Sequence, residues 1–306
     1  MIGSYPPWDM EALERDYVVH RLWEANDKAK FIAGLAPRIR AVATRGDLIC
    51  GADIINALPN LEIIGCYGVG TDGTDFTATR PRSIKVTNTP DVLTDDVADL
   101  ALGLIISVAR EMPQAERHLR AGKWPAAGMP LATRMSGKRL GIVGLGRIGM
   151  AIAKRAAAFG MAISYYNRSA KPETGYRRFE TLTELAANSD FLVAAIAAGP
   201  STAKLINGDV LKALGPDGFF VNIARGAVAD EEALIAALQN KTIKGAALDV
   251  YLDEPDIDRR FLTLDNAVLL PHIGSASVET RKAMGKLVRD NLAAHFAGKP
   301  LLTEVK

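Results

Sequence analysis

The chain has 306 residues, of which 48% are apolar and 24% charged, and its formal net charge is +2. This length fits two domains or one large α/β domain, and the composition is that of an ordinary globular protein. A net charge so close to zero gives no field that would attract nucleic acid or a membrane surface, so we expect neither partner.

The N-terminal segment MIGSYPPWDMEALERDY lacks the basic stretch and apolar run that mark a signal peptide. The most apolar segment, residues 100–109, is too short to cross a bilayer. Cys50 and Cys66 both lie in apolar surroundings and are expected to be buried free thiols. Together these features predict a cytoplasmic protein.

The first part of the chain alternates short apolar runs with helical patterns, which predicts parallel βαβ units. Strands are expected at residues 17–22, 39–43, 61–66 and 84–86, with helices near 25–33 and 52–57. Arg45 follows the second of these strands, at the end where α/β sheets bind ligands. It is a candidate substrate-binding residue, although a solvated loop arginine is an equally good interpretation.

A long helix is predicted from Thr94 through the segment TDDVADLALGLIISVARE. Thr94 is a suitable N-cap, and Asp95 and Asp96 suit the positive end of the helix dipole. The helix has little polar face, so we expect it to be buried at a domain or subunit contact.

A second βαβ series begins near residue 139. Its expected strands are 140–143, 162–166, 191–195, 219–223, 245–248 and 267–270. A last helix, residues 278–296, follows this series, and such a helix could lead back to the first domain.

The segment LGIVGLGRIGMAIAKRAAAFG contains G-x-G-x-x-G at Gly144, Gly146 and Gly149. The spacing alone is weak, but here it follows a strand pattern and opens a helix, which predicts a dinucleotide site. The three glycines serve a tight turn, close approach of the backbone to the pyrophosphate, and helix–strand packing.

An acidic ribose ligand should follow the next strand, yet the segment YYNRSAKP offers Asn167, Arg168 and Ser169. Asn167 would not repel a 2′-phosphate, Arg168 can pair with it and Ser169 can donate a hydroxyl. Lys171 adds positive charge nearby. These residues favour NADPH over the alternative of a solvated basic turn.

Of the four histidines, only His272 is expected in a loop after a strand of the second series, in LLPHIGSAS. Ligand chemistry is expected at that edge of a parallel sheet. Reduction of a ketone needs a proton donor near neutral pH, and histidine is the usual choice.

These motifs together resemble the D-isomer-specific 2-hydroxyacid dehydrogenases, and most of all their NADPH-preferring glyoxylate and hydroxypyruvate reductases, including hydroxyphenylpyruvate reductase-like enzymes. The resemblance covers almost the whole chain. It is carried by YGVGTDGTD (67–75), VTNTPDVLTDDVADLALGL (86–104), GKRLGIVGLGRIG (137–149), ISYYNRSAKP (163–172), VNIARGAVADEEAL (221–234), ALDVYLDEP (247–255) and LLPHIGSASVETR (269–281).

The resemblance implies a catalytic set of Arg225, Glu254 and His272. Arg225 would bind the 2-oxo acid, Glu254 would hold the tautomer of the histidine and favour its imidazolium, and His272 would be the acid and base. Asp249 would receive the nicotinamide carboxamide, and the backbone of Val69 and Gly70 the substrate carboxylate. The full expected cofactor-binding set is Gly144, Gly146, Arg147, Ile148, Gly149, Asn167, Arg168, Ser169, Ile223, Asp249, Gly274 and Ser275, and no metal site is expected.

The chain departs from the family pattern in places. Ala197, Ala198 and Gly199 stand where the family usually has Pro-Leu-Thr, and Val97 replaces a common Thr. A large side chain of the partner subunit reaches the substrate in related reductases, and Trp124 and Met129 lie in the equivalent loop.

We therefore expect an α/β protein of two Rossmann-like domains with parallel sheets. A flavodoxin-like substrate domain would span residues 1–97 and 281–306, and a dinucleotide-binding domain 98–280, with substrate in the cleft between them. The expected function is NADPH-dependent reduction of a small 2-oxo acid, such as glyoxylate or hydroxypyruvate, to the D-2-hydroxy acid by a homodimer. One alternative is an NAD-dependent D-2-hydroxyacid or phosphoglycerate dehydrogenase, in which an acidic residue would be expected at the position of Asn167. A second alternative is a nucleotide-sensing corepressor of the same fold.

Overall fold

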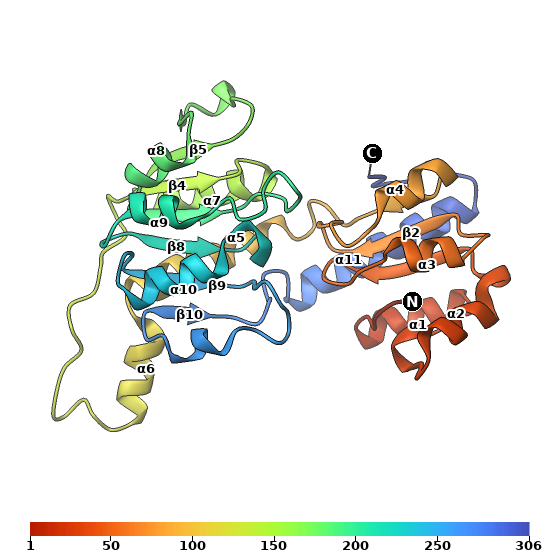
Figure 1. The fold of residues 1–306 in the computed structure, drawn as a ribbon, viewed down its shortest axis with the longest axis horizontal. Coiled ribbons are helices and arrows are strands. Elements are labelled where there is room, and N and C mark those ends of the chain that lie inside the picture. The colour runs from red at the N-terminus through yellow and green to blue at the C-terminus, as the bar shows by residue number, and fades with distance from the viewer. Residues whose placement is uncertain (306) are drawn as a thin grey trace. The chain divides into compact units, whose positions relative to one another are not determined.

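The computed structural model describes residues 1–305, which form two compact units (Figure 1). Unit 1 comprises Met1–Leu93 together with the chain from Ser275 onward, and unit 2 comprises Thr94–Gly274. The boundaries expected from the sequence lie a few residues further along the chain, at 97/98 and 280/281.

Unit 1 contains a parallel three-stranded sheet in the order β1-β2-β3. Its strands are β1 (Ala41–Arg45), β2 (Ile63–Tyr67) and β3 (Lys85–Thr87), and its helices are α1 (Pro7–Asp16), α2 (Lys28–Leu35), α3 (Ala52–Ala57), α4 (Phe76–Thr79) and α11 (Val278–Phe296). One apolar core lies between the sheet and α3, where Val42, Ile55 and Ile64 are buried. Helix α11 packs against β2, where Gly65 leaves room for Val288.

The N-terminal part of unit 1 differs from the expectation. Residues 17–22 do not form a strand, and Val18 is 85% exposed, so this apolar run does not cover a core. His20, which lies in this run, is therefore on irregular backbone. Helix α1 was not predicted, although Pro7 stands at its start, where proline is favoured because its missing N–H has no helical partner.

Unit 2 contains a parallel seven-stranded sheet in the order β10-β9-β8-β7-β4-β5-β6. The strands are β4 (Arg139–Val143), β5 (Ala162–Tyr166), β6 (Arg177–Arg178), β7 (Phe191–Ala194), β8 (Phe219–Asn222), β9 (Gly245–Leu248) and β10 (Ala267–Leu269). The chain builds outward from β4 through β5 and β6, and then returns to the other side of β4 with β7. The strand order thus reverses between β4 and β7, which is where such sheets bind ligands.

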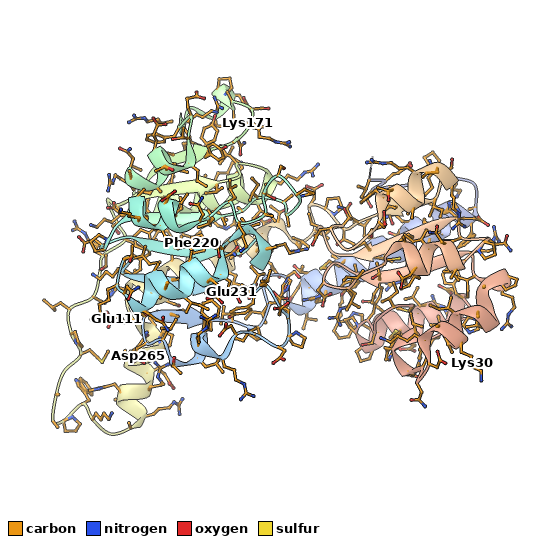
Figure 2. All side chains as sticks on the ribbon, viewed as in Figure 1. Lys30, Glu111, Lys171, Phe220, Glu231 and Asp265 are labelled. Carbon is orange, nitrogen blue, oxygen red and sulfur yellow. The ribbon has the colours of Figure 1, made fainter. Side chains whose placement is uncertain are left out.

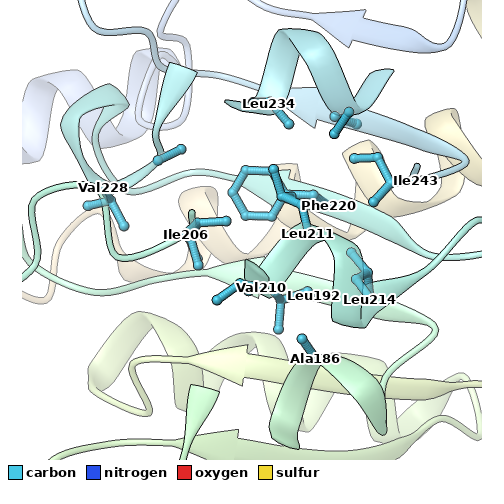
Figure 3. Packing of buried hydrophobic residues seen from close by; sticks show 14 of the residues in the cluster. Ala186, Leu192, Ile206, Val210, Leu211, Leu214, Phe220, Val228, Leu234 and Ile243 are labelled. Atoms are coloured by element: carbon cyan, nitrogen blue, oxygen red, sulfur yellow. The ribbon is translucent and has the colours of Figure 1, made fainter. Parts of the chain in front are cut away.

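Helices cover both faces of this sheet (Figure 1). Helices α5 (Thr94–Ala109) and α7 (Arg147–Ala158) pack together on one face, and α8 (Leu182–Ala187), α9 (Gly208–Leu214) and α10 (Glu231–Gln239) lie on the other. Figure 3 shows the core under α9 and α10, where Leu192 and Phe220 of the sheet meet side chains such as Leu211 and Leu234. The short 3-10 helices of the chain are Leu22–Glu24, Ala36–Arg38, Arg80–Arg82, Pro172–Thr174, Gly226–Val228 and Arg259–Thr263.

The long helix α5 is apolar because it is buried within its own unit. Its buried residues include Ala101, Leu104 and Ile105, and it packs against α7 and strands β8, β9 and β10. Arg155 of α7 pairs with Asp95 and Asp99 on its outer side, at 2.9 and 2.5 Å. The apolarity of this helix therefore needs no second subunit to explain it.

Helix α6 (Met112–Arg120) and the following segment, residues 121–134, stand off the sheet of unit 2 as an arm (Figure 1). The arm exposes large apolar side chains: Trp124 is 67% exposed and Leu131 is 99% exposed. Across residues 1–305, no helix is long and apolar enough to cross a membrane.

Candidate active site

The expected cofactor and catalytic residues of unit 2 follow the carboxyl ends of its strands. Gly144 follows β4, Asn167 follows β5, Arg225 lies beyond β8, Asp249 directly follows β9, and His272 comes after β10. Because all seven strands are parallel, these ends share one edge of the sheet. Residues far apart in sequence are thereby brought to one edge.

The glycine-rich turn has the geometry that a dinucleotide cradle requires. Gly144 has φ of +97°, and a Cβ there would lie 2.7 Å from the carbonyl oxygen of Ala195, in the loop after β7. A Cβ at Gly149 would lie 2.2 Å from the carbonyl oxygen of Gly144, so the helix could not approach the turn. Gly146 is the N-cap of α7, and apart from its chain neighbours no group lies within 4 Å of its Cβ position. This open backbone at a helix N-terminus fits a pyrophosphate group.

The side chain of Asn167 is tied to this turn. Its Oδ1 accepts a hydrogen bond of 2.7 Å from the backbone N–H of Leu145, and the Gly144 N–H donates to the carbonyl oxygen of Tyr166 at 3.0 Å. The carbonyl of the Asn167 side chain thus positions the glycine turn, and its Nδ2 amide remains for a ligand. Arg168 and Ser169 follow it on exposed backbone. The sequence could not reveal this contact, because it joins two loops 22 residues apart.

Glu254 and His272 form a hydrogen-bonded pair, with 2.6 Å between His272 Nδ1 and Glu254 Oε2. The second oxygen of Glu254 accepts from the backbone N–H of Tyr251 at 2.8 Å. Burial alone would raise the pKa of Glu254, but the bonds from His272 and Tyr251 and the charge of Arg225 hold it below its usual value. An ionised carboxylate can only accept hydrogen bonds, so His272 Nδ1 carries the hydrogen that it donates to Glu254. His272 Nε2 is then the ring atom that can gain or lose a proton.

The backbone at His272 is unusual and is held by Asp249. His272 has φ of +53°, a left-handed conformation that costs a residue with a side chain about 1–2 kcal/mol. The two oxygens of Asp249, which is 2% exposed, accept from the N–H groups of Ile273 at 2.7 Å and Gly274 at 2.8 Å. Burial raises the pKa of Asp249, and these two bonds oppose that rise. Asp249 thus fixes the turn that presents His272; its expected contact with nicotinamide stays a prediction.

Arg225 is positioned by buried neighbours. Asn222, at 1% exposure, donates from Nδ2 to the Arg225 carbonyl at 3.0 Å and accepts from the Ala224 N–H at 3.1 Å. A Cβ at Gly226 would lie 1.8 Å from the carbonyl carbon of Tyr251, so only glycine lets the arginine loop approach the loop that carries Glu254. Ile223, expected to contact the cofactor, directly follows β8 and is 8% exposed.

Sequence reasoning missed Asn222 and Glu231 as supports of the site. Glu231 Oε2 accepts from the backbone N–H of Leu252 at 3.0 Å, which anchors the loop between Asp249 and Glu254 from α10. Burial raises the pKa of Glu231, and the nearby carboxylates of Asp258 and Asp253 add to the rise. Both residues stand in the quoted segment VNIARGAVADEEAL, so the motif that gave Arg225 also contained its supports.

Unit 1 carries the expected substrate-binding residues on the corresponding edge of its own sheet. Arg45 ends β1 and forms a two-pronged ion pair with Asp47, in which Nε lies 2.9 Å from Oδ1. This pairing raises the pKa of Arg45. Val69 and Gly70 lie in the loop after β2, where the Val69 carbonyl accepts from Asn88 Nδ2 at 2.8 Å. Their role in binding substrate stays a prediction.

The remaining expected residues are placed without a tested role. Arg147 and Ile148 open helix α7, while Gly274 ends unit 2 and Ser275 begins the return to unit 1. In the segment 197–199, which lacks the usual Pro-Leu-Thr, Thr202 Oγ1 donates to the carbonyls of Ala197 and Gly199 at 2.9 and 3.2 Å. Within residues 1–305, no cluster of three or more His, Cys, Asp or Glu side chains could hold a metal ion.

Comparisons with known proteins agree with this geometry. Residues 102–274 match the family model described as D-isomer specific 2-hydroxyacid dehydrogenase, NAD binding domain. The chain is 47% identical over 295 residues to hydroxyphenylpyruvate reductase of Plectranthus scutellarioides, covering 96% of this chain and 94% of the relative. It is 46% identical over 304 residues to 2-ketogluconate reductase of Gluconobacter oxydans (strain 621H), covering 99% and 97%.

A solved structure shares the fold over almost the whole chain. It is an NADPH-dependent glyoxylate/hydroxypyruvate reductase from Sinorhizobium meliloti in complex with NADP and malonate, with 40% identity and a TM-score of 0.92 over 99% of this chain and 95% of that one. The α/β fold of two Rossmann-type units and the resemblance inferred from the motifs are both confirmed. The chain belongs to the D-isomer specific 2-hydroxyacid dehydrogenase family.

Proposed function

We propose that this chain reduces small 2-oxo acids to D-2-hydroxy acids with NADPH, as a glyoxylate/hydroxypyruvate reductase. The observation that carries the proposal is the His272–Glu254 pair, with Arg225 nearby, on the sheet edge that also bears the glycine-rich turn. The names of the relatives support the same class of reaction.

The chain's own residues have separate tasks in this reaction. The planar guanidinium of Arg225 binds the carboxylate and carbonyl of the 2-oxo acid and polarises the ketone. NADPH, when bound, supplies the hydride to the carbonyl carbon. His272 gives the Nε2 proton of its imidazolium to the carbonyl oxygen, which becomes the hydroxyl of the product. Glu254 keeps the ring oriented and stabilises the imidazolium until that transfer.

The cofactor is held by unit 2 in this proposal. The glycine turn at Gly144–Gly149 and the N-terminus of α7 bind the pyrophosphate, and Arg168 and Ser169 bind the 2′-phosphate. NADPH is preferred to NADH because no carboxylate stands at Asn167 to repel that phosphate. In unit 1, Val69, Gly70 and Arg45 bind the substrate.

The test is the oxidation of NADPH and NADH with a panel of 2-oxo acids. The panel contains glyoxylate, hydroxypyruvate, hydroxyphenylpyruvate and 2-ketogluconate. We expect turnover with NADPH and at least one of the two smallest acids. No turnover with any of them, together with tight nucleotide binding, would favour the nucleotide-sensing alternative.

We also propose that the chain is a homodimer and is cytoplasmic. The arm formed by α6 and residues 121–134 supports the dimer, because it exposes the large apolar side chains of Trp124 and Leu131, which contact with a second copy would bury. Light scattering at micromolar concentration tests the dimer, and a stable monomer would contradict it.

A further inference from the structure

The loop that carries Arg168 and Ser169 is held at both of its ends. At one end, Asn167 Oδ1 accepts from the Leu145 N–H at 2.7 Å. At the other, the backbone N–H of Lys171 donates to the hydroxyl of Tyr165 at 2.6 Å, and Tyr165 is only 1% exposed. Figure 2 shows Lys171 at the outer end of unit 2, beyond β5. The exposed residues between these two points thus have a defined backbone.

A third support comes from Arg178 on the edge strand β6. Its Nε donates to the carbonyl oxygen of Asn167 at 3.2 Å, and its Nη2 donates to that of Arg168 at 3.3 Å. Its Nη1 pairs with Glu180 Oε1 at 2.8 Å, which fixes the plane of the guanidinium. Strand β6 pairs with β5 only at Ser164 and Tyr165, so the carbonyls of Asn167 and Arg168 lie beyond that pairing and receive their hydrogen bonds from the Arg178 side chain.

This support acts on the residue expected to recognise phosphate. The guanidinium of Arg168 makes no hydrogen bond or ion pair with any of residues 1–305, so the protein orders this residue through its backbone alone. A loop that must be ordered on binding loses conformational entropy, and a loop held in place beforehand avoids most of that loss.

We propose that Arg178 is a positioning residue for recognition of the 2′-phosphate: it holds the carbonyls of Asn167 and Arg168 so that the Arg168 side chain starts from a fixed point. This inference rests on the proposed preference for NADPH. It adds that the preference depends on a residue ten positions further along the chain, which acts through the backbone and does not contact the phosphate.

The test is Arg178→Ala, read out by binding as well as by turnover. Dissociation constants for NADPH and NADH come from nucleotide fluorescence, and those for adenosine 2′,5′-bisphosphate and AMP come from calorimetry. We expect NADPH and the bisphosphate to bind roughly tenfold more weakly, and NADH and AMP to change less than about twofold. A tenfold loss is at the lower end of the value of a charge-assisted hydrogen bond, because Arg168 can still reach the phosphate but from a less ordered backbone. Equal weakening of all four ligands, or of none, would overturn the proposal.

Arg177→Ala is the matched control. This neighbouring arginine also belongs to β6, but its guanidinium lies over the ring of Phe179, 4.4 Å from the ring centroid. The substitution Arg177→Ala removes one positive charge from β6, as Arg178→Ala does. An equal loss of NADPH selectivity in the two variants would therefore show that only the charge matters. Arg178→Lys keeps the charge but not the planar fork, and we expect an intermediate loss. If Arg178→Ala does not fold, Arg178→Lys provides the test in its place.

The double variant Arg168→Ala/Arg178→Ala separates positioning from direct contact. If Arg178 acts through Arg168, its removal costs little further NADPH affinity once Arg168 is gone. A full further loss would mean that Arg178 itself touches the phosphate and would overturn the positioning role. Failure of the proposed function has a different signature: the unmodified protein would bind the bisphosphate no better than AMP.

Discussion

Replacement of Glu254 by Gln tests the pair at the centre of the proposed chemistry. The carboxylate now accepts two bonds, from the Tyr251 N–H at 2.8 Å and from His272 Nδ1 at 2.6 Å. A glutamine has one acceptor oxygen. If that oxygen stays on the Tyr251 N–H, the side-chain NH₂ group faces Nδ1, and the neutral ring must move its hydrogen to Nε2.

The expected loss follows from these contacts. One charge-assisted hydrogen bond is worth about 1.5–3 kcal/mol, so kcat/KM for reduction should fall by ~10- to 150-fold at the optimal pH. The pH dependence has a definite sign. Reduction consumes the proton of the imidazolium, so the rate falls as pH rises. Without the negative charge of Glu254 the imidazolium is less stable, and this fall should begin at lower pH than in the unmodified protein.

The assay is kcat/KM for hydroxypyruvate at saturating NADPH, from about pH 5 to about pH 8, the range in which histidine titrates. Glu231→Gln is the control, because Glu231 holds the same loop through the Leu252 N–H at 3.0 Å. The control should keep the profile of the unmodified protein even if its rate falls. A Glu254→Gln variant with an unmoved profile would refute the pairing as the source of proton transfer.

Other substitutions address the remaining roles. His272→Asn should lower kcat by ~10²- to 10⁴-fold with NADPH binding nearly intact, and near-normal turnover would remove this residue from the mechanism. Arg168→Ala should lower the ratio of kcat/KM for NADPH to that for NADH by ~10- to 150-fold at fixed ionic strength, whereas an unchanged ratio would argue against contact with the 2′-phosphate. Asn167→Asp should act in the same direction, since Asp retains an acceptor for the Leu145 N–H and adds a negative charge. Arg45→Ala should raise KM for hydroxypyruvate more than KM for NADPH, and unchanged substrate kinetics would favour a purely structural pair with Asp47.

The seven-stranded sheet could be predicted largely from the sequence because its inner strands, such as β7, β8 and β9, are buried along their whole length. Strand Phe191–Ala194 is wholly buried and is an unbroken apolar run, and Phe219–Asn222 is wholly buried and apolar except for its last residue. Strand β6 could not be found in this way, because it has two residues, Arg177 and Arg178, and both are charged. A short apolar run also predicted a strand at residues 17–22, but this prediction was wrong, and only Leu22 of that run is buried.

The candidate site divides in a similar way. Residues whose chemistry is visible in a motif, such as Gly144, Arg225 and His272, could be named from the sequence. The supporting contacts could not, because they depend on which loops meet in three dimensions. Asn167 illustrates the limit, since its residue type suggested an absent charge but not that its carbonyl holds the Leu145 N–H.

Unit 1 is assembled from both ends of the chain, and this has a consequence for the order of folding during synthesis. Helix α11 (Val278–Phe296) packs against β2, and its Arg289 forms an ion pair with the buried Asp9 of α1. The ribosome releases these partners almost a full chain length apart. Unit 2 is continuous from Thr94 to Gly274, so it can fold while the last residues are still being made. Unit 1 cannot complete its fold until α11 has been synthesised, and until then the apolar surface of β2 is uncovered. A premature stop before residue 278 would therefore leave a folded unit 2 attached to an incomplete, aggregation-prone unit 1.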